Sequence, residues 1–260
     1  MTEAPLQGVG VLVTRPRAQA AGLATAIENR GGKAFRFPVI EIVPRPESRV
    51  AAEVAALPLP DIVIFVSPNA VEYGLRYAKD STIGAIGPAT EAAIKASGRV
   101  VDISPQIGYD SESLLAEPAL SAVAGKHVLI VRGNNGLEHL AESLRNRGAK
   151  VSYLSVYNRN LPKIDPQLLA EIEAAWRSGE IGVVTVMSVQ SLKNLATVLP
   201  DWCASRLGAV VLVTPAARVI KEALQRYPSS KPVLASGPQA AEMVAAIIDI
   251  YRTDLEKQHE

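Results

Sequence analysis

Four proline-containing turns carry the pattern in this sequence that most suggests chemistry. Each follows a short apolar run and precedes a helical pattern: Ser67-Pro68-Asn69-Ala70, Gly87-Pro88-Ala89-Thr90, Thr214-Pro215-Ala216 and Ser236-Gly237-Pro238. Proline suits the first position of a helix, and the backbone N–H groups that follow it are left unpaired. Such groups bind anions. One turn of this kind simply starts a helix, but four of them predict an anion-rich ligand.

Arginine stands at the end of two predicted strands, at Arg15 and Arg132. Its guanidinium can bind a carboxylate there through two hydrogen bonds, although an arginine at a strand end can equally be a solvated surface residue. The segment RGNNG at 132–136 is similar to a phosphate-binding turn but lacks the glycine order of a dinucleotide fingerprint. We therefore expect no dinucleotide.

Side chains for acid–base or metal chemistry are sparse. His127, His139 and His259 are the only histidines, and they fall in a predicted strand, a helix and a charged tail. They form no serine–histidine–carboxylate set and no metal-ligand spacing, and the strand ends lack the acidic cluster of a magnesium site. We expect no metal and no cofactor. An enzyme of this kind would act mainly by holding a reactive substrate in the right shape.

The overall composition limits the partners. A net charge of +1 and an aromatic content of 5% argue against a nucleic-acid surface. No apolar stretch approaches the roughly 18 residues of a membrane span, and the N-terminal MTEAPLQGVG has no pattern of a secretion signal. Cys203 is the only cysteine, which fits a reducing compartment. We expect a cytoplasmic monomer that binds a small molecule and neither nucleic acid nor a membrane.

The elements that must position these residues are built twice. Residues 8–45 recur without a gap at 125–162, with eleven identities that include Arg15 with Arg132 and Gly31 with Gly148. A chain of 260 residues is also long enough for two domains. Two equivalent halves predict a groove between domains, which is a preferred place for a small-molecule site.

Strand and helix patterns alternate along the chain. In the two copies, apolar runs at 9–14, 33–37, 128–131 and 151–156 flank helical faces made by Ala20, Leu23, Ala24 and Ile27 and by Leu137, Leu140, Ala141 and Leu144. Further strands are expected near 61–66, 82–86, 181–187, 209–213 and 232–235. This rhythm predicts an α/β fold whose parallel sheets are covered by helices on both faces.

Two proline-bounded stretches, 38–46 and 156–162, occupy the same place in the two copies and are extended by composition. They pair naturally as two crossings of one hinge. In that layout residues 1–37 complete the C-terminal half and 125–155 complete the middle half. Two contiguous domains are the alternative, and the residue patterns alone leave both open.

A series of motifs adds a resemblance. They are LVTRPRAQAAGL at 12–23, FVSPNAVEYGL at 65–75, AIGPATEAAIKASG at 85–98, YDSESLLA at 109–116, VLIVRGNNGLEHLAESLRNRGAKV at 128–151, VYNR at 156–159 and a final S-G-P-x-A-A turn. In this order they resemble the uroporphyrinogen-III synthase family. The resemblance implies two flavodoxin-like domains with parallel sheets, joined by a two-strand hinge. One implied domain combines residues 1–37 with residues 160–260, and the other is residues 41–155. The implied hinge strands are 38–40 and 156–159.

The resemblance also implies an activity. Such a lyase would close the linear tetrapyrrole hydroxymethylbilane to uroporphyrinogen III, with loss of water and inversion of ring D. The substrate carries several carboxylates, which suits helix N-termini and arginines. It also cyclises unaided to another isomer, so control of its conformation decides the product. Transient contact with hydroxymethylbilane synthase is an implied partner interaction.

The family match implies site residues. Tyr157 in VYNR corresponds to a hinge tyrosine that would assist departure of the ring A hydroxyl, although a tyrosine packed for stability is the alternative. The implied substrate-binding residues are Arg15, Ser67, Asn69, Thr90, Arg132, Ser188, Gln190 and Thr214. The C-terminal half departs from the pattern, because 187–190 lacks a proline and alanine fills 216–217.

Two other functions fit the repeat. One is a non-catalytic bilobal module that closes on an anionic metabolite, as a sensor does. The other is a two-domain glycosyltransferase, which the missing nucleotide motifs disfavour. A fused effector segment would favour the binding module, and the sequence shows none.

Overall fold

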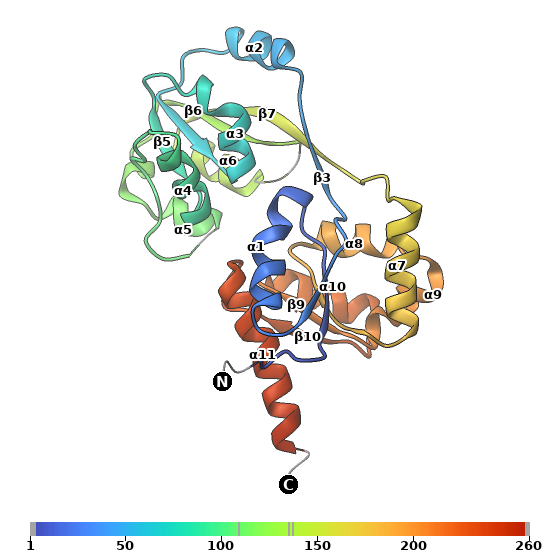
Figure 1. The fold of residues 1–260 in the computed structure, drawn as a ribbon. Helices are drawn as coiled ribbons and strands as arrows, with labels where there is room; N and C mark the ends of the chain where they lie inside the picture. Colours follow the sequence, from blue (N-terminus) through green and yellow to red (C-terminus); the bar gives the residue numbers. More distant parts are fainter. Residues whose placement is uncertain (1–3, 109, 135, 137, 258–260) are drawn as a thin grey trace. The chain divides into compact units, whose positions relative to one another are not determined.

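The computed structural model describes residues 4–108, 110–134, 136 and 138–257. Leu137 and His259, which the sequence places in a helix and in the tail, lie outside the described residues. The chain forms two compact units (Figure 1). Unit 1 comprises residues 1–41 with 160–260, and unit 2 comprises residues 42–159.

Unit 1 is built on a five-stranded sheet of order β10-β9-β8-β1-β2. Its strands are β1 (Gly10–Val13), β2 (Lys33–Arg36), β8 (Ile181–Thr185), β9 (Val211–Thr214) and β10 (Lys231–Leu234), and all of them pair in parallel. β1 is buried along its whole length, as expected for a parallel strand covered on both faces.

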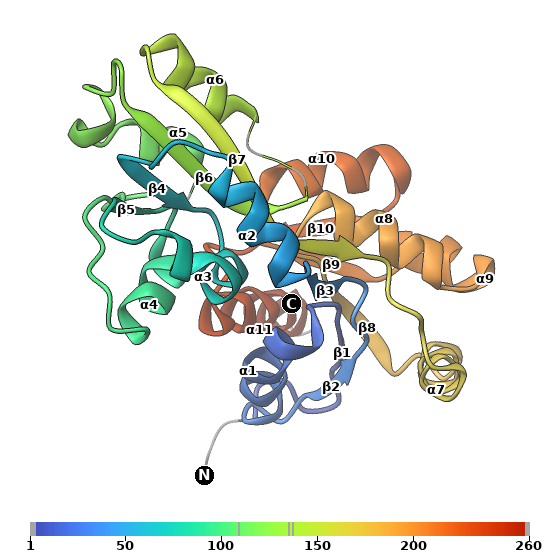
Figure 2. The ribbon, with the colours of Figure 1, turned by 90° about the horizontal axis from the view of Figure 1, so that it is seen from above.

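Helices cover both faces of this sheet. They are α1 (Arg17–Glu28), α7 (Pro166–Arg177), α8 (Val189–Val198), α9 (Asp201–Ala204), α10 (Ala217–Arg226) and α11 (Ala240–Lys257), with the 3-10 helix η3 at Ser205–Gly208. Figure 2 shows α1 and α11 on one face and α8 and α10 on the other. The buried face of α1 consists of the predicted residues Ala20, Leu23, Ala24 and Ile27.

Unit 2 is built on a second sheet, of order β3-β7-β6-β4-β5. Its strands are β3 (Glu41–Pro44), β4 (Ile62–Phe65), β5 (Thr82–Ala85), β6 (His127–Gly133) and β7 (Lys150–Asn160). The pairings among β4, β5, β6 and β7 are parallel. The predicted α/β fold with two parallel sheets is therefore confirmed.

The helices of unit 2 form two separate cores with its sheet. They are α2 (Glu47–Ala55), α3 (Pro68–Gly74), α4 (Pro88–Ala96), α5 (Ser111–Leu115) and α6 (Glu138–Asn146), with the 3-10 helices η1 (Leu75–Tyr77) and η2 (Pro118–Leu120). α2, α3 and α4 pack on the face that carries Phe65 and Val131. α5 and α6 pack on the face that carries Ile64 and Ile130.

The sequence repeat corresponds to a repeated strand–helix–strand element. β1-α1-β2 and β6-α6-β7 each pair their two strands in parallel. Each helix is followed by a glycine with φ +84°, Gly31 in the first copy and Gly148 in the second. That left-handed conformation favours glycine, so the shared Asn-Arg-Gly sequence ends both helices in the same way.

Candidate functional site

The carboxyl ends of the strands in unit 2 carry Ser67 and Asn69. Ser67 is the N-cap of α3, and its Oγ accepts a hydrogen bond from the Ala70 N–H at 3.1 Å. Pro68 occupies the first helical position, as predicted. Asn69 follows in the first turn and is half-buried. The short turn therefore fixes the Ser67 hydroxyl at the end of β4.

Thr90 lies in the first turn of α4. Pro88 opens this helix after Gly87, as predicted. The Thr90 N–H already donates to the Gly87 carbonyl at 3.0 Å, and the residue is 3% exposed. Its hydroxyl is therefore largely covered.

The prediction that a helix starts at the proline of each of the two turns in unit 1 is wrong. α10 begins at Ala217, and the Thr214 Oγ1 accepts the Ala216 N–H at 3.2 Å, so a local side-chain turn precedes the helix and Pro215 lies outside it. α11 begins at Ala240, two residues after Pro238. Thr214 is fully buried, and its hydroxyl serves this turn.

Ser188 and Gln190 lie at the start of α8. Ser188 caps this helix without a following proline, and its Oγ accepts the Ser191 N–H at 3.1 Å. Gln190 is exposed and donates through its amide to Asn194, which in turn donates to the Val39 carbonyl at 2.8 Å. Gln190 therefore supports the segment that leads to β3.

The repeat-related arginines are both bound by the protein. Arg15 donates to the Pro238 carbonyl, and burial lowers the pKa of its guanidinium. Arg132 donates to the Gly136 carbonyl and lies 3.6 Å from the ring centroid of Tyr153. The buried Nε atoms of both arginines have no hydrogen-bond partner among the described residues. Arg15 thus braces the segment that follows β10, and Arg132 braces the segment that follows its own strand, β6.

Tyr157 is fully buried in the core beside α3. Its hydroxyl lies 3.1 Å from the Ser67 Oγ and accepts a hydrogen bond from an Nη of Arg159 at 3.2 Å. The Arg159 side chain is exposed, so the phenol is linked to the surface through this guanidinium. The structure therefore brings Ser67 and Tyr157 together and adds Arg159, which the sequence analysis missed.

β7 also contains a β-bulge at Tyr157 that was not predicted from the sequence. Arg132 on β6 pairs with Ser155 on β7, but the next residue, Gly133, pairs with Tyr157. Val156 is therefore an extra residue on β7. The signal available in the sequence was Gly133 itself, next to a predicted strand, because glycine in a strand often marks a bulge or a close approach.

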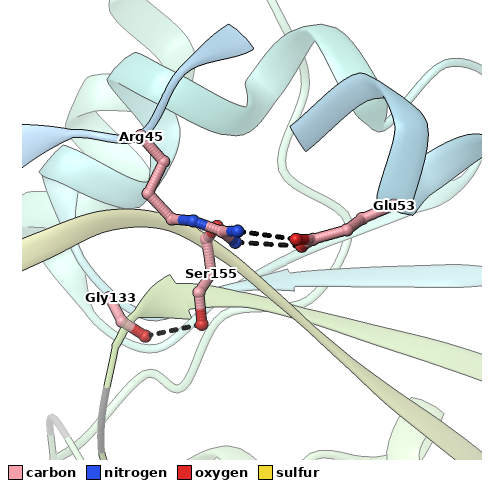
Figure 3. Close-up of polar contacts among 4 residues, drawn as sticks. All are labelled: Arg45, Glu53, Gly133 and Ser155. Atoms are coloured by element: carbon pink, nitrogen blue, oxygen red, sulfur yellow. Dashed lines mark hydrogen bonds and ion pairs between the residues drawn. The ribbon is translucent and has the colours of Figure 1, made fainter. Parts of the chain in front are cut away.

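Arg45 and Glu53 lie beside this bulge, and Arg45 contacts the bulged strand β7 (Figure 3). Arg45 forms a two-point contact with Glu53, at 2.9 and 2.6 Å, and donates to the Ser155 carbonyl at 2.7 Å. Its hydrogen bond with Glu53 raises the pKa of Arg45 and lowers that of Glu53. The Ser155 hydroxyl donates to the Gly133 carbonyl at 3.2 Å.

Two properties of the described residues bear on the type of site. They hold no group of three His, Cys, Asp or Glu side chains placed to ligate a metal ion. Within the same part of the chain, no helix has the length and apolar composition that crossing a bilayer requires. The hydroxyl and guanidinium groups around Tyr157 can donate and accept protons and can bind anions.

Comparisons with known proteins give the family. The family model described as "Uroporphyrinogen-III synthase HemD" matches residues 21–245. The uroporphyrinogen-III synthase of Escherichia coli (strain K12) is 31% identical over 203 residues, covering 75% of this chain and 81% of the relative. That of Salmonella typhimurium is 32% identical over 203 residues, with the same coverage.

Solved structures agree on the fold. A mutant uroporphyrinogen III synthase from the extremely thermophilic bacterium Thermus thermophilus has a TM-score of 0.61 at 19% identity, covering 96% of this chain and 99% of the other. The enzyme from Helicobacter pylori 26695 has a TM-score of 0.63 at 13% identity, covering 93% of this chain and 99% of the other. From the family model and the bacterial relatives together, the chain belongs to the uroporphyrinogen-III synthase family.

Proposed function

We propose that the chain is a uroporphyrinogen-III synthase, a lyase that closes hydroxymethylbilane to uroporphyrinogen III with loss of water. The observation that carries this proposal is the family match over residues 21–245, which includes the central strands of both units. The match favours this activity over a non-catalytic module that binds an anionic metabolite. It likewise gives no support to a glycosyltransferase.

The reaction needs a choice between two ring closures. Direct closure of the linear substrate gives the symmetric isomer I. To give isomer III, the substituted carbon of ring D attacks the ring A methylene, the ring A hydroxyl leaves as water, and a spiro intermediate reopens and closes with ring D inverted. A protein that binds the conformation leading to the spiro intermediate lowers the barrier to this path alone.

The hydrogen-bond arrangement supports a proton-donating role for Tyr157. The phenol oxygen has two acceptor positions, and Arg159 fills one of them. If the Ser67 hydroxyl donates to the other, the phenol proton is free for the departing hydroxyl. The guanidinium of Arg159 then stabilises the phenolate that forms. Because the ring is fully buried, substrate binding must first uncover the hydroxyl.

The substrate carboxylates bind, in this proposal, along the carboxyl ends of the strands in each unit. Backbone N–H groups at the starts of α4, α8 and α10 supply donors with the positive end of a helix dipole. The supporting side chains are Arg15, Asn69, Thr90, Arg132, Ser188, Gln190 and Thr214. All of them lie where a strand ends or a following helix begins.

A hinge and a cellular setting complete the proposal. Residues 38–40 and 156–159 would form a hinge between two domains. One domain would combine residues 1–37 with 160–260, and the other would be residues 41–155. The supporting observation is that β3 and β7 are neighbours in one sheet. The protein would act as a cytoplasmic monomer, and its single cysteine, which is free and buried, supports a reducing compartment. Direct transfer of the unstable substrate from hydroxymethylbilane synthase would limit its spontaneous closure.

Separation of the product isomers tests the function. Freshly generated hydroxymethylbilane is incubated with and without the protein, the products are oxidised, and the porphyrin isomers are separated by chromatography. We expect a large excess of isomer III only with the active protein, and heat-denatured protein is the control. An isomer I signal that the protein leaves unchanged would contradict the proposal.

A further inference from the structure

We propose that the Ser155 hydroxyl, together with Arg45, is a positioning device for Tyr157: it holds the β-bulge that directs the phenol toward Ser67. This inference rests on the proposed role of Tyr157 in the reaction. Neither Ser155 nor Arg45 contacts the phenol hydroxyl in the structure, so neither is a catalytic residue.

The bulge decides which face of the sheet receives Tyr157. Side chains along a regular strand alternate between faces, so Tyr153, Ser155 and Tyr157 would share one face. Tyr153 packs on the face of α5 and α6. Leu154, Val156 and Tyr157 instead all lie in the core beside α3. The extra residue has therefore moved Tyr157 to the opposite face, which is a known effect of bulges near active sites.

Ser67 shows why this face matters. It caps α3, which packs on the same face as Tyr157, and its Oγ lies 3.1 Å from the phenol oxygen. A phenol on the α6 face would be separated from Ser67 by the sheet. The bulge is thus required for the hydrogen bond between the two hydroxyls.

Three hydrogen bonds hold the bulge, two at Ser155 and one at the extra residue Val156. The Ser155 Oγ donates to the Gly133 carbonyl at 3.2 Å, which ties the bulge to β6. On the other side, the Arg45 guanidinium donates to the Ser155 carbonyl at 2.7 Å, and the Arg45 N–H donates to the Val156 carbonyl at 3.0 Å. Arg45 therefore satisfies the Ser155 and Val156 carbonyls, and the Ser155 hydroxyl satisfies the Gly133 carbonyl of β6.

Glu53 orients the guanidinium that makes one of these bonds. The Arg45 side chain is 20% exposed, whereas Glu53 is 48% exposed. Their two-point contact fixes the plane of the guanidinium, which a single contact would not do (Figure 3). Arg45 thus reaches the bulge in one orientation.

A double-mutant cycle tests the positioning role. We expect Ser155→Ala to lower kcat about fivefold, the effect of losing one uncharged hydrogen bond, with KM nearly unchanged. Ser155→Thr keeps the hydroxyl and should restore kcat. Tyr157→Phe should lower kcat at least about tenfold, and adding Ser155→Ala to it should cause no further loss. Interacting residues show this non-additivity, and independent ones do not.

A spectroscopic signal tests the same point without turnover. With 13Cζ-labelled tyrosine, the resonance of Tyr157 is the one that disappears in Tyr157→Phe. Ser155→Ala and Glu53→Gln should shift it. The matched control is Glu47→Gln, which removes another ion pair of α2, with Arg76, that does not contact β7. This control should leave both the resonance and kcat unchanged.

The outcomes separate the two hypotheses. Wild-type turnover in Tyr157→Phe would overturn the role of Tyr157 and, with it, this inference. A slow Tyr157→Phe variant in which Ser155→Ala still costs fivefold would overturn this inference alone. So would a Tyr157 resonance that does not respond to Ser155→Ala.

Discussion

Tyr157 depends on a glycine for its place in the core. A Cβ atom at Gly133 would lie 2.7 Å from the Tyr157 Cε2 and 2.9 Å from its Cζ. Real Cβ contacts are longer, and the ring has no free space because it is fully buried. The residue opposite the bulge therefore has to be glycine for reasons of volume rather than of backbone conformation.

This contact makes Gly133→Ala destabilising. We expect a loss of about 1–3 kcal/mol in the free energy of unfolding, the usual cost of overpacking a core, and a fall in kcat because the ring must shift. Urea denaturation of the whole protein, followed by circular dichroism, measures the first effect. Gly22→Ala is the control, because Gly22 is an exposed position in α1 with no atom near the new methyl group. It should gain about 0.5–1 kcal/mol, and equal losses in both variants would contradict the packing argument.

For individual residues, the sequence predicted part of the candidate site. Ser67 and Ser188 could be recognised as caps because capping depends on neighbours within a few residues. The burial of Tyr157 and its contact with Arg159 could not, since they depend on the pairing of β6 with β7. The carboxylate-binding roles of Arg15 and Arg132 stay predictions, because both guanidiniums donate to protein carbonyls.

Among the elements, α4 is tied to the chain that follows it through Glu91. This carboxylate accepts hydrogen bonds from Lys95, one turn later, and from the Ser104 hydroxyl at 2.6 Å. The contact with Lys95, followed by that with Ser104, lowers the pKa of Glu91. Ser104 immediately follows Ile103, which bridges to Gly84 of β5, so the carboxylate connects α4 to the edge of the sheet.

The lowered pKa predicts a pH dependence of stability. The unfolded chain binds a proton at Glu91 near the ordinary glutamate pKa of about 4.3, and the folded chain binds it only at lower pH. The stabilisation is therefore complete above the unfolded pKa and is lost as pH falls through the folded pKa. We expect Glu91→Gln to be less stable than wild type at pH 7, with a difference that shrinks below about pH 4. Denaturant titrations at several pH values measure it, and a difference that is constant with pH would contradict the linkage.

The element boundaries show where local signals are sufficient. The starts of α3 and α4 were predicted correctly, since Pro68 and Pro88 each follow a residue that can end a strand and cap a helix. The starts of α10 and α11 were not. Before α10 the Thr214 Oγ1 accepts the Ala216 N–H, and such a side-chain turn competes with helix initiation. α11 begins at Ala240, where the Glu242 carboxylate accepts the Gln239 N–H and so caps the helix beyond Pro238.

The tryptophans and the cysteine of the protein all lie in one of its two units. Cys203, Trp176 and Trp202 all belong to unit 1, so tryptophan fluorescence and thiol chemistry report on that unit alone. The Cys203 thiol is fully buried, and burial raises its pKa to about 11. Few thiolates exist at neutral pH under these conditions, and the thiolate is the reactive form.

We therefore expect Cys203 to resist a thiol-specific reagent at pH 8 until unit 1 opens. The rate of labelling should rise with urea in parallel with the change in tryptophan fluorescence. An exposed thiol, Ser205→Cys in a Cys203→Ala background, should react at once and is the control for the reagent. Rapid labelling of Cys203 in the native protein would show that the surrounding α9 segment is open.

The interrupted course of unit 1 through the sequence has a consequence for synthesis on the ribosome. β1 lies between β2 and β8 in its sheet, but β8 begins only at Ile181, after all of unit 2 has been made. At roughly 5–20 residues per second, the nascent apolar strand waits on the order of ten seconds for this neighbour. The middle segment can complete its own sheet during that interval. The C-terminal part of the chain, which is made last, therefore has to cover β1 and so protect it from aggregation.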